Sequence, residues 1–85
     1  MYKVFIEKQV RKQLKKIPEP DYSKIKTAIL NFSQNPRPYG YKKLKARLGH
    51  RVRVGNYRII YEINDNLRSV YVFDVGHRKD IYRNI

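Results

Sequence analysis

The chain has 85 residues, of which 41% are hydrophobic, and this length predicts a single domain over residues 1–85 with one small core. It contains no cysteine and no apolar stretch near the roughly 20 residues of a membrane span, so thiolate metal sites and membrane-spanning helices are excluded and a cytoplasmic protein is expected. Lysine and arginine number 20 against 7 aspartate and glutamate residues, and the formal net charge of +13 favours polyanionic partners, either nucleic acid or an acidic protein.

The amino-terminal third predicts one strand followed by two helices. Residues 2–7 are rich in β-branched and aromatic side chains, which favours a strand. Residues 8–16 then carry apolar side chains at helical spacing, and a second helical repeat runs over residues 22–32 until Asn35 and Pro36 end it. A proline-rich turn separates the two repeats, so we expect a helical hairpin.

The next segment, residues 36–50, combines turn-forming proline and glycine with a dense run of basic residues. We expect most of it to be loop. Lysines such as Lys43 and Lys45 are expected to add nonspecific attraction to phosphate. For Tyr39 and Tyr41 the sequence leaves two roles open, contact with RNA or packing at the surface.

Residues 51–63 alternate apolar and charged side chains on both sides of Gly55-Asn56, a pattern typical of a hairpin with a two-residue loop. With these two residues as the loop, Val54 faces Tyr57 and Arg53 faces Arg58. Because strand side chains alternate between faces, one face then collects the apolar residues Val52, Val54, Tyr57, Ile59, Tyr61 and Ile63.

The other face of this hairpin collects Arg51, Arg53 and Arg58. Like charges placed directly opposite each other in a sheet destabilise it. A bound anion would remove that repulsion, and guanidinium groups match the oxygens of a phosphate. We interpret this face as a phosphate site, against the alternative that these arginines are only solvated.

A second turn over residues 64–66 leads to a last strand over residues 69–75, which Gly76 is expected to end. The basic segment over residues 77–83 is expected to cross the open end of the sheet. The predicted order is β-α-α-β-β-β, an α+β fold in which a small, mostly antiparallel sheet packs against an amino-terminal helical hairpin.

These residues resemble the RelE/ParE superfamily of toxins, the effector halves of toxin-antitoxin pairs. The resemblance covers nearly the whole chain and rests on an ordered set of motifs: Asn35-Pro36-Arg37, Lys43-Leu44, the run from Arg51 to Tyr61, Val75-Gly76-His77-Arg78 and Ile81-Tyr82. It implies a RelE-like toxin that inhibits translation by cleaving messenger RNA at the ribosomal A site, without metal or cofactor. It also implies an acidic, RelB-like antitoxin as partner.

The resemblance assigns roles to individual positions. Arg51 and Arg53 correspond to basic positions on the first hairpin strand of the family, where the best-studied RelE toxins carry lysines. Arg58 corresponds to the arginine on the next strand. Arg78 and Tyr82 correspond to the arginine after the final strand and the tyrosine near the end.

Cleavage of RNA through its own 2′-hydroxyl needs a base, an acid for the leaving oxygen, and cations around the phosphorus. We expect Arg53, Arg58 and Arg78 to hold the scissile phosphate, and Arg58 or Arg78 to serve the leaving oxygen. Guanidinium is a poor base because its pKa exceeds about 12, so Tyr82 and His77 are the candidates for proton transfer. Tyr82 could instead stack on a base, and His77 could cap the strand end. The supporting or RNA-binding residues expected are Arg51, His77, Lys43, Lys45 and Arg83.

Two other functions stay open on the sequence alone. ParE-like relatives share the fold and inhibit DNA gyrase, but they generally lack the full set of positions described above. A nonenzymatic RNA-binding module would explain the charge, yet it gives no reason for pairing Arg53 with Arg58.

Overall fold

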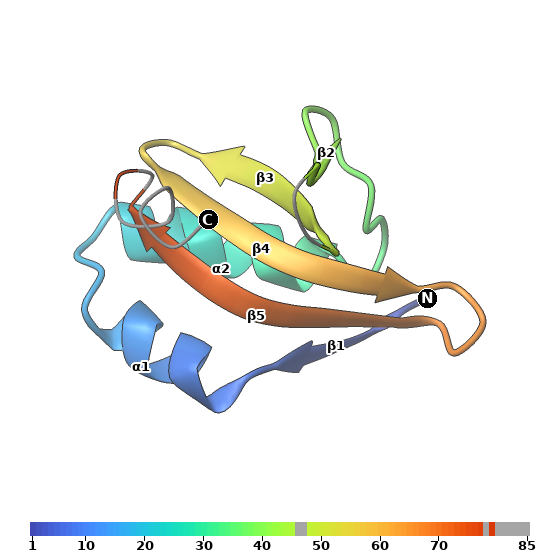
Figure 1. Cartoon of the computed structure of the whole chain (residues 1–85). Helices are drawn as coiled ribbons and strands as arrows, with labels where there is room; N and C mark the ends of the chain where they lie inside the picture. Colours follow the sequence, from blue (N-terminus) through green and yellow to red (C-terminus); the bar gives the residue numbers. More distant parts are fainter. Residues whose placement is uncertain (46–47, 78, 80–85) are drawn as a thin grey trace.

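A computed structural model describes residues 1–45, 48–77 and 79, and within them two helices accompany a five-stranded sheet (Figure 1). The strand order across the sheet is β1-β5-β4-β3-β2. β1 runs parallel to β5, and the other neighbouring strands are antiparallel, so the predicted α+β fold with a mostly antiparallel sheet is confirmed. The elements are β1 (Lys3–Ile6), α1 (Lys8–Lys15), α2 (Asp21–Asn31), β2 (Lys42–Lys43), β3 (His50–Val54), β4 (Tyr57–Asn64) and β5 (Ser69–His77).

Both predicted helices are present, and in Figure 1 α2 passes behind the sheet while α1 lies beside β5. Each helix buries part of its apolar stripe, Val10 in α1 and Ile25 in α2. α2 ends at Asn31, earlier than the pattern suggested. The N–H groups of residues 32–34 donate to carbonyls three residues back, so the chain tightens into a narrower turn there. Within the described ranges, neither helix is long and apolar enough to cross a membrane.

The core lies between the helices and one face of the sheet. The apolar face predicted for the hairpin forms the sheet side of this core, with Val52, Ile59 and Tyr61 buried and the other three residues partly buried against them. Full burial of each aliphatic side chain contributes about 1.5–3 kcal/mol, so this face accounts for much of the driving force for folding. The other buried members of the core are Val10, Ile17, Ile25, Ile29, Phe32, Val70, Val72 and Val75.

The register of β3 against β4 is the predicted one. Val54 pairs with Tyr57, Arg53 pairs with Arg58, and the ladder continues to His50 opposite Tyr61. Gly55 has a φ of +60°, a value that glycine adopts without steric cost at the first position of a two-residue hairpin loop.

β5 differs from the prediction in its length and regularity. Gly76 does not end the strand, because Arg58 pairs with Gly76 and Tyr57 pairs with His77. The register also shifts by one residue: Ile60 pairs with Asp74 while Tyr61 pairs with Val72, which leaves Phe73 as an extra residue. This bulge exchanges the faces of all side chains that follow it in β5.

α1 covers the part of β5 that β1 does not reach. The parallel pairing of β1 stops where Ile6 meets Val72. Beyond that point the Gln13 side chain accepts a hydrogen bond from the backbone N–H of Val75 at 2.9 Å and donates one to Asp74 Oδ1 at 2.9 Å. Gln9 donates to the carbonyl of Phe73 at the bulge. Glutamine side chains thus satisfy backbone groups on a strand edge that would otherwise be open.

Gly49 gives a direct test of the packing above the bulge. Its φ is +117°, and a Cβ placed there would lie 3.1 Å from the Phe73 ring and 3.1 Å from the Tyr61 carbonyl oxygen. We expect Gly49→Ala to lower the free energy of unfolding by about 1–3 kcal/mol in urea denaturation, because both the backbone and the contacts are strained.

Gly40→Ala is the matched control. Gly40 also has a positive φ, +87°, but a Cβ there meets nothing within 4 Å. The control should therefore lose only the backbone contribution, about 1 kcal/mol. Equal losses in the two variants would show that close packing at Gly49 contributes nothing.

Candidate functional site

The face of the sheet opposite the helices carries the basic residues that the sequence singled out. We call Arg51, Arg53 and Arg58 the arginine face. Arg53 and Arg58 are direct cross-strand partners, as predicted, and Arg51 lies opposite Ile60. On the other side of β4, Arg58 pairs with Gly76 of β5.

The three arginines differ in exposure, and the alternative that all of them are solvated does not hold for Arg58. Arg53 is exposed and Arg51 partly so, but Arg58 is only 1% exposed. Its neighbour on the same face, Ile60, is also fully buried although it does not belong to the core beneath the helices. Both residues belong to β4, which lies between β3 and β5 in the sheet. Arg53 is therefore the exposed member of this cross-strand pair and Arg58 the buried one.

His77 lies away from the arginine face. Because of the bulge at Phe73 it pairs with Tyr57, whose side chain packs against the core, and the two rings meet edge to face at 5.7 Å. The backbone N–H of Lys79 approaches His77 Nδ1 at 3.4 Å, which agrees with the capping alternative. Among the described residues, no group of three or more histidine, cysteine, aspartate or glutamate side chains is placed to hold a metal ion.

The basic segment before β3 extends the arginine face. Lys42 and Lys43 form the two-residue strand β2, which the sequence pattern was too short to reveal. Lys42 pairs with Arg51 and is exposed, so it adds a cation to this face. Lys43 pairs with His50, and Lys43 and Lys45 are both exposed. Three predicted site residues, Arg78, Tyr82 and Arg83, lie outside the described residues.

His50 and Tyr61 join the inner face to the loop after α2. The His50 ring lies 5.8 Å from the Tyr41 ring and 5.8 Å from the Tyr61 ring, and Tyr61 stacks on Phe32 at 4.2 Å. The Tyr61 hydroxyl donates to the carbonyl of Pro36 at 2.8 Å. Burial lowers the pKa of His50 and raises the pKa of Tyr61, so both side chains are neutral at physiological pH. This cluster is structural.

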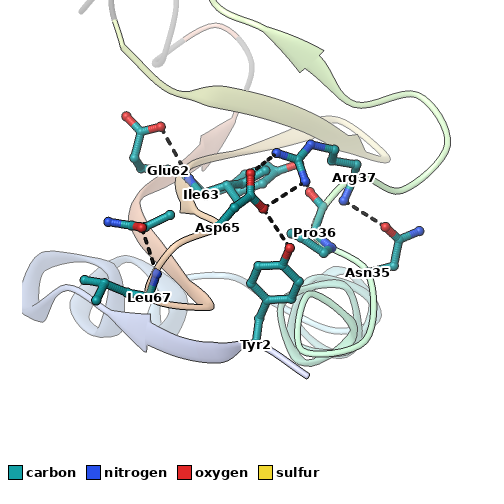
Figure 2. A network of polar contacts seen from close by, with 10 residues as sticks. Tyr2, Asn35, Pro36, Arg37, Glu62, Ile63, Asp65 and Leu67 are labelled. Carbon is teal, nitrogen blue, oxygen red and sulfur yellow. Dashed lines mark hydrogen bonds and ion pairs between the residues drawn. The ribbon is translucent and has the colours of Figure 1, made fainter.

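Asp65 collects a second set of contacts at the turn between β4 and β5 (Figure 2). Arg37 donates to both of its carboxylate oxygens, at 2.8 and 3.3 Å, and the Tyr2 hydroxyl donates to Oδ1 at 2.7 Å. The hydrogen bonds from Arg37 and Tyr2 lower the pKa of Asp65 to about 2. Three distant segments, the amino terminus, the loop after α2 and this turn, are thereby tied together.

Comparison with known proteins gives a consistent family assignment. The profile of the ParE toxin of the type II toxin-antitoxin system, parDE, matches residues 4–82. The putative toxin RelE1 of Methanocaldococcus jannaschii is 31% identical, covering 98% of this chain and 97% of that protein. Toxin RelG of Mycobacterium tuberculosis is 34% identical, covering 96% and 97% respectively.

Solved structures agree. The toxin-antitoxin complex RelBE2 from Mycobacterium tuberculosis contains a chain that matches with a TM-score of 0.78 and 28% identity, over 91% of this chain and 98% of that one. The RelB-RelE antitoxin-toxin complex from Methanococcus jannaschii matches with a TM-score of 0.77 and 30% identity, over 95% and 98%. The isolated RelE toxin of E. coli, at 20% identity and a TM-score of 0.75, shares the fold.

The lowered pKa of Asp65 predicts how the stability of the fold changes with pH. A carboxylate whose folded pKa lies below its ordinary value of 3.8 stabilises the fold above that value, and the contribution is lost as the pH falls towards about 2. We expect Asp65→Asn to lower the urea midpoint slightly at neutral pH, because the pair is exposed, and to have a shrinking effect between about pH 4 and pH 2. A difference between the two proteins that is constant over this range would contradict the role assigned to the Asp65 charge.

Proposed function

Since the chain belongs to the RelE/ParE superfamily and is a toxin of the type II toxin-antitoxin class, we propose that it is an endoribonuclease that cleaves messenger RNA at the ribosomal A site. The observation that carries the proposal is the direct pairing of Arg53 with Arg58 across two strands. The paired guanidinium groups supply positive charge and N–H donors on one face of the sheet, and both match the oxygens of an RNA phosphate. Arg51 and Lys42 continue the basic surface along the same face.

Each arginine has its own part in this mechanism. Arg53, which is exposed, binds the scissile phosphate directly. Arg58, buried beside it, contributes positive charge that stabilises the transition state without being surrounded by water. Arg78 completes the phosphate site and serves the leaving oxygen, as the family resemblance implies.

Tyr82 stacks on a base or assists proton transfer in this proposal. His77 is not given the role of base, because it lies on the opposite face of the sheet from Arg53. The ribosome orients the messenger, and such positioning lowers the demand for a strong base on the protein. No metal takes part.

The partner that controls the toxin is its antitoxin. Related toxins form RelB-RelE complexes, and we infer a RelB-like, acidic partner for this chain as well. The formal charge of +13 supports acidity in that partner, because oppositely charged surfaces both steer association and relieve repulsion within the toxin. Toxin, antitoxin, messenger and ribosome would meet in the cytoplasm.

Inhibition of DNA gyrase is the second candidate, since the matching family profile is the one named for the ParE toxin. The two candidates give different readouts. A gyrase inhibitor would block supercoiling of plasmid DNA by purified gyrase and would leave messenger RNA intact. The proposed nuclease would cleave messenger RNA and would leave the supercoiling activity of gyrase unchanged.

Cleavage of messenger in a translating extract tests the site. We expect Arg53→Ala and Arg78→Ala each to slow cleavage by about 100-fold or more, the usual cost of removing one group that stabilises transition-state charge. Arg58→Lys keeps a buried cation but loses the planar fork, and it should slow cleavage by at least about tenfold. Cut positions are mapped by primer extension with and without ribosomes.

Arg11→Ala is the control, because Arg11 is an exposed cation on α1 that does not lie on the arginine face. It should cleave like the unaltered chain. Thermal denaturation of every variant separates loss of chemistry from loss of fold. Cleavage at the wild-type rate by Arg53→Ala and Arg78→Ala would contradict the proposed site. An equal loss of rate in Arg11→Ala would show that only the total positive charge of the protein matters.

A further inference from the structure

The turn between α2 and β2 displays one tyrosine entirely to solvent. Tyr39 is 104% exposed, whereas the next most exposed tyrosine in the described ranges, Tyr71, is 44% exposed. The backbone N–H of Tyr41 donates to the carbonyl of Pro38 at 3.0 Å, and Gly40 has a φ of +87°. These features are typical of a type II turn with glycine at its third position, which places Tyr39 at the corner.

The backbone on both sides of this turn is fixed. Before the turn, the buried hydroxyl of Tyr61 donates a hydrogen bond to the carbonyl of Pro36. Arg37 forms an ion pair with Asp65 (Figure 2). After it, the Tyr41 ring packs against His50. Tyr39 therefore stands on a rigid support, and its ring loses little conformational freedom when it binds a partner.

The surroundings of Tyr39 are basic. Lys42, Lys43 and Lys45 follow it and all three are exposed. Residues 36–50 contain no aspartate or glutamate. In Figure 1 the green segment around β2 rises beyond β3 at the edge of the sheet, so it can meet a partner that also covers the arginine face.

An exposed aromatic ring among cations suits an unpaired nucleobase. Bases stack on aromatic side chains whatever their identity, and lysines bind the flanking phosphates. The fold itself gains nothing from the exposed ring. An acidic protein would also be attracted by the lysines, and measurement of its binding is therefore part of the test.

We propose that residues 38–45 form a second RNA contact, in which Tyr39 stacks on an unpaired base and the exposed Lys43 and Lys45 bind nearby phosphates. This contact deepens the proposed function and rests on it for the presence of RNA, but it is separate from the phosphate site at Arg53. The base belongs either to ribosomal RNA or to the messenger strand, and the experiment distinguishes them.

The test measures binding in the absence of cleavage. Two probes are used with the full chain: ribosomes without messenger, and a single-stranded RNA oligonucleotide carrying 2′-O-methyl groups, which cannot be cut through the 2′-hydroxyl. We expect Tyr39→Ala to weaken binding to at least one probe by about tenfold, a typical effect of losing one stacked base. Tyr39→Phe keeps the ring and should bind like the unaltered chain.

Leu30→Ala is the surface control, because Leu30 is 60% exposed on α2 and lies outside the turn. It should leave binding to both probes unchanged. A loss confined to ribosomes assigns the base to ribosomal RNA, and a loss with the oligonucleotide assigns it to the messenger strand.

Unchanged binding of Tyr39→Ala to both probes would overturn the proposal, as would an equal loss in Tyr39→Phe. Weaker binding to the acidic antitoxin with RNA binding unchanged would assign the turn to that partner and overturn it too. Failure of the nuclease proposal looks different: the unaltered chain would bind ribosomes and cut no messenger, while the effect of Tyr39→Ala on binding would persist.

Discussion

The pairing of β3 with β4 across Gly55-Asn56 is the constraint on which the rest of the structure depends. A single register places the apolar residues of both strands against the helices and leaves the arginines on the other face. A shift by one residue would move every side chain to the wrong face and would expose the core. The same register that buries Ile59 therefore brings Arg53 beside Arg58. Stability and the proposed chemistry share one set of backbone hydrogen bonds.

The bulge at Phe73 is a second constraint, and it acts on the last strand. It allows Val70, Val72 and Val75 all to face the core, although regular alternation would turn Val75 outward. The bulge also pairs His77 with Tyr57 on the core side of the sheet and pairs Gly76 with Arg58 on the other side. Gln9 and Gln13 of α1 bind the backbone around the bulge. Contacts from α1 thus stabilise the bulge that places Gly76, rather than His77, beside Arg58.

Electrostatics divide the surface into parts with different roles. The ion pair between Asp65 and Arg37 neutralises the Arg37 charge and anchors the loop after α2, so Arg37 has a structural role. Arg53, Lys42 and Lys43 are exposed, and a partner of opposite charge would reduce the repulsion among them. RNA and an acidic antitoxin both meet that requirement. Under the proposed function, the two partners would compete for one basic surface, and binding of the antitoxin would exclude RNA from it.

The sequence by itself determined the helices, the hairpin and the pairing of Arg53 with Arg58, because these follow from periods and turns within about 20 residues of chain. Only the tertiary structure decided that Arg58 is buried and that β1 pairs with β5 in parallel. It also decided that Phe73 forms a bulge and that His77 therefore lies on the face opposite the arginines. Each of these depends on groups far apart in the chain, as when Gln13 binds Val75 across 62 positions. Local patterns carry no information on such contacts, since they are fixed by the packing of one element on another.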